Sequence, residues 1–200
     1  MFQTISWVSL SLVLVVVLLH WLVSPLRLPK REAAGQFCWG CIGEADSSLG
    51  KLNRLACVVA LGSLAVLFVT GFGGRLLLGE AIHGYTQMVH VCLAPVFVIS
   101  SGVVLVGWGH RCRLNGDDRQ DLADLLRLRG ANPADLGWKL TFWLAMFLVV
   151  PVSLSMVLCM FPIFGTHGQE SLLALHQYTA LALVLVVLIH MHLLLRRCCK

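Results

Sequence analysis

The composition of this chain is that of a membrane protein. Of its 200 residues, 58% are hydrophobic and only 12% are charged, which is far from the balance found in soluble domains. The formal charge of +5 does not indicate nucleic-acid binding, because the sequence contains no continuous basic helix and no aromatic platform. We therefore expect an all-α integral membrane protein.

Five stretches are long and apolar enough to cross a bilayer, which takes about 20 residues at a rise of about 1.5 Å each. The first lacks the basic start and the cleavage site of a secretory signal, so we expect it to be retained as a helix. Within the five stretches, the only Asp, Glu, Lys or Arg is Arg75, near the end of the second. The stretches are roughly Ile5–Val23, Leu55–Leu78, Thr86–Trp108, Leu140–Phe164 and Ser171–Leu195.

The basic residues lie on one side of the expected topology. Fourteen of the 15 Lys and Arg residues fall in the segments Arg27–Arg54 and Arg111–Lys139 and in the C-terminal tail. With five spans these segments share a side, which the positive-inside rule makes cytoplasmic. The sequence therefore predicts a multi-pass protein of a bacterial or archaeal inner membrane, with the N-terminus outside and the C-terminus in the cytoplasm.

The eight cysteines do not predict a disulfide framework, because most of them face the cytoplasm or lie within spans. Cys38-Trp-Gly-Cys41 has the spacing of two metal ligands. The sequence contains no second pair with this spacing. The sequence therefore leaves open whether Cys38 and Cys41 bind a metal ion.

Histidines within the spans are the main candidates for chemistry, because an ionisable side chain in a bilayer is costly and usually serves ligand or proton chemistry. His90 and His176 both lie near the outer surface, on spans that run in the same direction. His190 follows His176 by 14 residues, which is about 21 Å along a helix axis and within about 40° around it. Both rings can face one bundle interior, as two stacked haems require. The full set is His20, His90, His176, His190 and His192.

A haem held by two histidines needs rings from facing helices at one depth, an apolar pocket, and small residues that admit the macrocycle. His90 and His176 meet the depth condition, and Gly, Ala and Ser residues lie nearby on both spans. An interhelical hydrogen bond is the alternative for each histidine, and close helix packing is the alternative for the small residues.

Several short motifs occur together in the region Lys51–Arg197. The last span contains His176 and the run His190-Met-His192, and the third span begins with Gln-Met-Val-His90. Further matches are Asn53-Arg54, Thr70-Gly71 and Gly137-Trp-Lys-Leu-Thr-Phe-Trp143. In this combination the region resembles the cytochrome b (gamma) subunit of the membrane-bound formate dehydrogenases, a family shared with related molybdoenzyme and hydrogenase anchors.

The resemblance implies a four-helix transmembrane bundle with two haems b. His90 and His176 match the ligands of the outer haem, and His190 matches one ligand of the inner haem. The family's second inner ligand stands three residues after its arginine, and that position is Cys57 here. Thiolate ligation serves oxygen activation more than electron transfer, so we do not expect Cys57 to replace that histidine.

The additional first helix offers another ligand, because His20 is expected at the depth of His190. We predict that His20 and His190 bind the inner haem. A single outer haem, with His190 at a quinone site, is the alternative. His192 points about 200° away from His190 around a helix, so we expect it at a helix interface or near the quinone.

The resemblance also implies a quinone site near the inner haem, where the family's polar residues align with Asp135 and Trp138. The carboxyl group of Asp135 can exchange a proton or hydrogen bond with a quinone ring. The indole of Trp138 only donates, so the site is expected to bind a different quinone or none.

The sequence thus predicts two parts: residues 1–50 with the additional helix and the CxxC pair, and residues 51–200 with the four-helix cytochrome b domain. The expected function is that of a membrane-anchoring b-type cytochrome subunit of a respiratory oxidoreductase complex. It would carry electrons, in either direction, between the quinone pool and an extracytoplasmic iron–sulfur or multihaem partner of a catalytic dehydrogenase or reductase subunit.

The competing interpretation is a cofactor-free membrane scaffold or small transporter whose histidines bind protons or a metal. The absence of carboxylates from the expected spans and of detectable inverted repeats argues against it.

Overall fold

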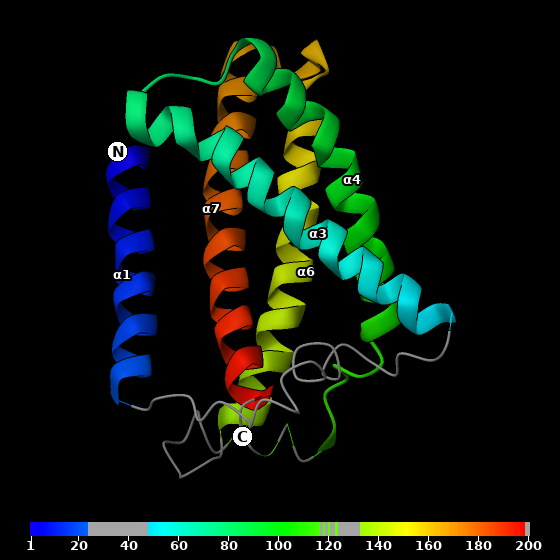
Figure 1. Ribbon diagram of the computed structural model, residues 1–200. Helices are drawn as coiled ribbons and strands as arrows, with labels where there is room; N and C mark the ends of the chain where they lie inside the picture. Colours follow the sequence, from blue (N-terminus) through cyan, green and yellow to red (C-terminus); the bar gives the residue numbers. More distant parts are fainter. Residues whose placement is uncertain (24–47, 117, 119, 121–122, 124–132, 199–200) are drawn as a thin grey trace.

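The computed structural model describes residues 1–23, 48–116, 118, 120, 123 and 133–198, and within these ranges the regular structure is entirely helical (Figure 1). Two short elements follow long helices: the π-helix η1 (Gly74–Leu78) after α3, and the 3₁₀ helix η2 (Pro162–Phe164) after α6. The long helices are α1 (Phe2–Val23), α3 (Ser48–Gly73), α4 (Gly84–Trp108), α6 (Pro133–Cys159) and α7 (Gly165–Cys198).

Five helices of the described ranges are long and apolar enough to span a membrane, which confirms the number predicted from the sequence. The expected fourth span, Leu140–Phe164, is wrong at both ends, because the apolar helix covers Leu136–Cys159. It ends there since Phe161 is extended and Pro162, which opens η2, cannot continue an α-helix. Gly165, with φ of 63°, then begins α7 before the expected start at Ser171.

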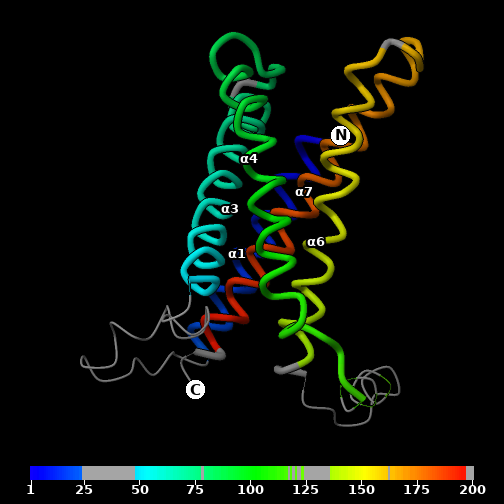
Figure 2. Tube along the Cα trace, turned by 90° about the vertical axis from the view of Figure 1, so that its right-hand side faces the viewer, coloured from blue at the N-terminus to red at the C-terminus, as the bar shows by residue number. Residues whose placement is uncertain are grey.

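The four helices after residue 47 form two antiparallel hairpins. α3 packs along α4, and α6 packs along α7. The hairpins meet through two clusters of buried apolar side chains, one around Trp108 and Phe142 and the other around Phe97 and Leu183. Figure 2 shows that the hairpins diverge toward the end where α3 connects to α4. The space between facing helices of such a bundle is where ligands and cofactors are held.

α1 lies outside the two hairpins and runs beside α7 (Figure 1). Ser6 is its buried residue, and most of its other side chains are exposed, as expected for a helix in contact with lipid. Its first turn is attached to the core: Gln3 Nε2 donates to the carbonyl oxygen of Leu76 at 3.0 Å, and the Phe2 ring lies 5.3 Å from the Tyr178 ring, edge-on, and 5.9 Å from the Phe72 ring. α1 is therefore an addition to the four-helix core.

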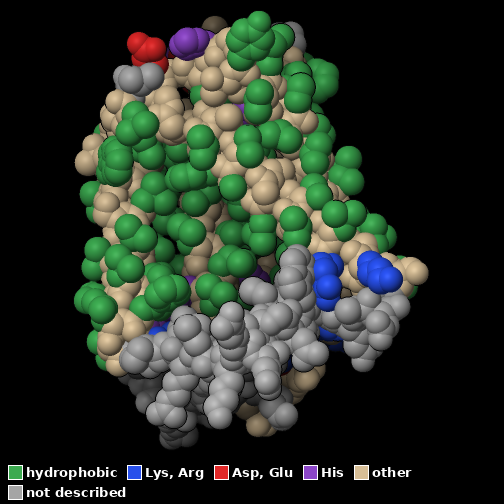
Figure 3. Space-filling view, viewed as in Figure 1, with side chains coloured by type: hydrophobic (Ala, Val, Ile, Leu, Met, Phe, Trp, Pro, Cys, Tyr) green, Lys and Arg blue, Asp and Glu red, His purple; other side chains and the backbone are tan. Residues whose placement is uncertain are grey.

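The charged residues distinguish the two ends of the molecule. On the face shown in Figure 3, Lys and Arg side chains gather at the lower end, and acidic and His side chains appear at the upper end. We call the lower end the basic end: it holds the starts of α3 and α6 and the ends of α1, α4 and α7. The opposite end holds η1, η2 and the starts of α4 and α7.

An ion pair fastens the segment after α4 to α6 at the basic end. Lys139 Nζ lies 2.6 Å from Asp118 Oδ2, and the backbone N–H of Asn115 donates to the same oxygen at 2.7 Å. The hydrogen bond from Lys139 holds the pKa of the Asp118 carboxyl below its ordinary value. Trp143 Nε1 also donates to the carbonyl oxygen of Cys112 at 2.9 Å. These bonds fix how the end of α4 meets the start of α6.

Candidate functional site

His90 projects from α4 against α3 and is held in one tautomer. Its Nδ1 lies 2.9 Å from Oγ1 of Thr70. The Thr70 hydroxyl already donates its hydrogen to backbone carbonyls of the preceding turn, at 2.7 Å to Val66 and 3.2 Å to Leu67. A hydroxyl has only one hydrogen, so Nδ1 of His90 must be the donor in their bond. In its neutral state the ring then has a free lone pair on Nε2.

The close approach of His90 to α3 depends on a glycine. A Cβ atom built on Gly71 would stand 2.9 Å from Cε1 of His90, which is closer than real Cβ contacts come. Any larger residue at position 71 would therefore push on the ring. Thr70 and Gly71 together make the seat of the His90 imidazole.

His176 projects from α7 and is oriented in the same way. Its Nδ1 lies 2.9 Å from the carbonyl oxygen of Val152 on α6. A carbonyl only accepts, so Nδ1 of His176 carries the hydrogen and Nε2 again carries a lone pair. Metal-bound histidines are typically fixed by such a bond from the second ring nitrogen, which selects the tautomer and the ring direction.

The structure brings the His90 and His176 rings together across the space between the hairpins. Their centroids lie 6.4 Å apart and their planes are inclined at 77°. Two imidazoles on opposite sides of one metal ion, with bonds of about 2 Å, would have their ring centres about 6 Å apart. The separation of the two ring centroids is thus the one that two histidine ligands of a single metal ion would have.

A haem makes a smaller demand on the protein than a metal ion bound by side chains alone. The described residues contain no cluster of three or more His, Cys, Asp or Glu side chains that could enclose an ion. The macrocycle supplies four nitrogens itself, so two axial histidines suffice.

His190 is also held in one tautomer, on α7 toward the basic end. Its Nδ1 lies 2.9 Å from Oγ1 of Thr141, whose hydroxyl donates to the carbonyl oxygen of Gly137 at 2.9 Å. By the same reasoning Nδ1 donates and Nε2 of His190 has a free lone pair. The Phe142 ring lies beside it, with centroids 6.2 Å apart.

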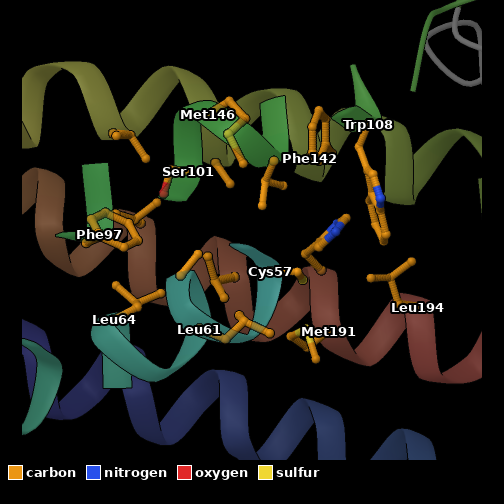
Figure 4. A pocket seen from close by; sticks show the side chains of 17 residues that line it. Cys57, Leu61, Leu64, Phe97, Ser101, Trp108, Phe142, Met146, Met191 and Leu194 are labelled. Atoms are coloured by element: carbon orange, nitrogen blue, oxygen red, sulfur yellow. The ribbon is translucent and has the colours of Figure 1, made fainter. Parts of the chain in front are cut away.

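An apolar pocket lies between the hairpins at the level of His190 (Figure 4). Its volume is about 130 Å³, which is smaller than the about 300–1,000 Å³ of most small-molecule sites. All four core helices contribute to its wall. His190 and Cys57 line it, together with the large side chains of Phe97, Trp108 and Phe142.

In the structure the ring of His20 bonds to His192 and not to His190. We expected His20 to share an inner haem with His190, but Nδ1 of His20 lies 2.9 Å from Nε2 of His192. Trp21 Nε1 donates to the other nitrogen of His192, Nδ1, at 3.0 Å. The difference arises because α1 lies against the face of α7 that carries His192, whereas His190 faces the pocket.

In the neutral state this bonding leaves His192 without a free lone pair. Nδ1 of His192 accepts from Trp21, so Nε2 carries the hydrogen and donates to His20. His192 is 8% exposed, at the seam between α1 and α7. The sequence predicts either an interface residue or a quinone contact at this position, and the geometry favours the interface.

The other predicted site residues lie at the basic end or outside the described part of the chain. Trp138 is 7% exposed and packs in the apolar cluster around Trp108 at the basic end. Asp135 lies in the first turn of α6, but its side chain is outside the described part, as are Cys38 and Cys41. Cys57 is half-buried on α3 and lines the pocket.

Sequence reasoning missed the two threonines that fix the histidines. Thr70 and Thr141 each lie within a span, where the hydroxyl can satisfy itself on the helix backbone. The signal that was present is that both fall in the short motifs Thr70-Gly71 and Gly137-Trp-Lys-Leu-Thr141. Their role as acceptors for His90 and His190 is visible only once the helices are placed.

Comparison of the chain with family models, with curated proteins and with solved structures finds no match.

Proposed function

We propose that this protein is a membrane-anchoring b-type cytochrome subunit, in which His90 and His176 bind one haem b between the two hairpins. One observation carries the proposal: rings from both hairpins meet with centroids 6.4 Å apart, and each has its Nδ1 bound and its Nε2 lone pair free. Two ring nitrogens prepared in this way are what a six-coordinate haem iron requires from a protein.

A bound haem supplies one-electron transfer at a potential set by its ligands and surroundings. The chain's contribution is to orient those ligands. The Thr70 hydroxyl and the Val152 carbonyl each accept the Nδ1 hydrogen of one ligand, at 2.9 Å. Such partners raise the basicity of the ring, and their loss typically costs about 10- to 100-fold in metal affinity.

Of the two arrangements that the sequence leaves open, we propose the one with a single haem and with His190 at a quinone site. The hydrogen bond between His20 and His192 supports this choice: neutral His20 accepts it at Nδ1, so its Nε2 carries the hydrogen and has no lone pair for iron. The apolar pocket beside His190 supports a hydrophobic ligand such as a quinone. The free lone pair on Nε2 of His190 is suited to accept a hydrogen bond from the hydroxyl of a quinol.

The proposed topology puts the basic end in the cytoplasm of a bacterial or archaeal inner membrane. The His90 and His176 pair then lies toward the outer surface, within reach of an extracytoplasmic iron–sulfur or multihaem subunit. That partner connects the haem to a catalytic dehydrogenase or reductase, and His190 faces the quinone pool. Asp135 and Trp138 stay proposed neighbours of the quinone.

The test is the visible spectrum and the haem content of the purified protein. We expect about one haem per chain, with a Soret band and a reduced α band, and loss of haem in His90→Ala and in His176→Ala. His167→Ala is the matched control, because His167 also lies on α7 but is fully exposed at 101%. A colourless wild-type protein from haem-replete cells would overturn the proposal and favour a cofactor-free scaffold or transporter.

A further inference from the structure

Arg75 is the one Lys or Arg residue that the described part of the chain places at the opposite end, and its guanidinium makes no hydrogen bond or ion pair with any described residue. The carboxylates at that end have other neighbours: Glu80 lies 3.7 Å from His83, and Glu170 lies 3.9 Å from His167. Arg75 is half-buried and falls within the span that ends at Leu77. A cation in this position normally has a partner.

The position of Arg75 on α3 and η1 relates it to the His90 seat. It follows Gly71 by four residues, which is about one helical turn and about 6 Å along the axis. Residues one turn apart share a face of a helix. Gly71 is in contact range of the His90 ring, so Arg75 begins on the same face, one turn closer to the opposite end.

The backbone around Arg75 is held in an unusual form. Residues Gly74–Leu78 form a π-helix, and Gly79 ends it with φ of 74°. π-helical turns are rare and frequently occur at functional sites. Gln3 Nε2 of α1 donates to the carbonyl oxygen of Leu76 at 3.0 Å, so the first turn of α1 fixes this segment in place.

We propose that Arg75 binds the carboxylates of the haem held by His90 and His176. This inference rests on the proposed function. A haem b has two carboxylate side chains, which are costly to bury in the apolar part of a bilayer without a cationic partner. The planar guanidinium matches a carboxylate with two parallel hydrogen bonds, and Arg75 is placed one turn from the ligand seat with its charge uncompensated.

The test compares Arg75→Gln, Arg75→Lys and the wild type, in the full-length protein, by haem content, α-band position and midpoint potential. Arg75→Gln removes the positive charge and leaves a polar side chain, whereas Arg75→Lys keeps the charge. Arg113→Gln is the matched control, because Arg113 is exposed at the basic end. The Arg75 charge stabilises the reduced haem, which carries one positive charge fewer than the oxidised haem.

We expect Arg75→Gln to retain a bis-histidine spectrum. Its midpoint potential should be lower by at least about 59 mV, which is a tenfold change in a one-electron reduction equilibrium. Arg75→Lys should recover part of the shift, and Arg113→Gln should have the wild-type potential. Loss of haem in Arg75→Gln that Arg75→Lys restores would also support the proposal.

Three results would overturn this inference. The first is a potential and haem content in Arg75→Gln equal to those of the wild type, as expected if Arg75 binds a lipid phosphate instead. The second is equal loss of haem in the Gln and Lys variants with unchanged helical content, which would indicate a packing role. The third is a wild-type protein without haem, which refutes the proposed function itself and is thereby distinguished from the other two.

Discussion

Replacing Gly71 with alanine tests the ligand seat directly. The new Cβ atom would stand 2.9 Å from Cε1 of His90, and ordinary van der Waals contact begins at 3.4 Å, so the ring must retreat by about 0.5 Å. A displacement of about 0.5 Å is already the limit within which ligand side chains must be held for function. Overpacking of this kind costs about 1–3 kcal/mol, which corresponds to a loss of haem affinity between about fivefold and about 150-fold.

The assay is haem titration of the apoprotein in detergent, followed by the α band and the midpoint potential. The matched control is Gly62→Ala on the same helix, where a Cβ atom meets nothing within 4 Å. Both changes raise helix propensity by a similar amount, so a difference between them reports the contact with His90. Equal haem affinity and equal potential in the two variants would refute the proposed seat.

Three further changes test the surrounding network. Thr70→Val removes the acceptor for Nδ1 of His90 and should lower haem affinity by about 10- to 100-fold, while Thr70→Ser should restore it in the same titration. His192→Phe removes the bonds to His20 and Trp21, each contributing about 1 kcal/mol; it should lower the thermal stability of the protein in detergent and leave the haem spectrum unchanged. Asp118→Asn should destabilise the protein at neutral pH. The pKa of Asp118 is lowered from 3.8 in the folded protein, so the ionised carboxyl stabilises the fold above that pH. This stabilisation is lost as the pH falls through the folded-state pKa. The melting temperatures of mutant and wild type should therefore converge in acid.

The spans and the meeting of two histidines could be predicted because both depend on distance along a helix axis. A bilayer fixes the number of apolar residues in a span, and the count from the start of each span gives the depth of His90 and His176. The structure brings those two rings together. The helix ends at Cys159 and Gly165 were missed, although Pro162 was a signal for a break.

The partner of His20 could not be predicted because depth does not determine the side on which a helix packs. His190 and His192 differ by about 3 Å along the axis of α7 but by about 200° around it. α1 can therefore meet either histidine at nearly the same depth. Trp21 was the available signal, since an indole N–H in a span needs an acceptor, and His192 provides one at 3.0 Å.

The hydrogen bonds divide the intramembrane histidines into two chemical kinds. His90, His176 and His190 donate from Nδ1 to an oxygen and keep Nε2 free, and all three lie in the four-helix core. His192 has both ring nitrogens engaged, at the seam with α1. The three Nε2 atoms are thus left available to a ligand, whereas both ring nitrogens of His192 are used in joining α1 to α7. The free lone pairs are therefore the feature that a cofactor-free function has to explain, and a haem at His90 and His176 with a quinol at His190 uses each of them.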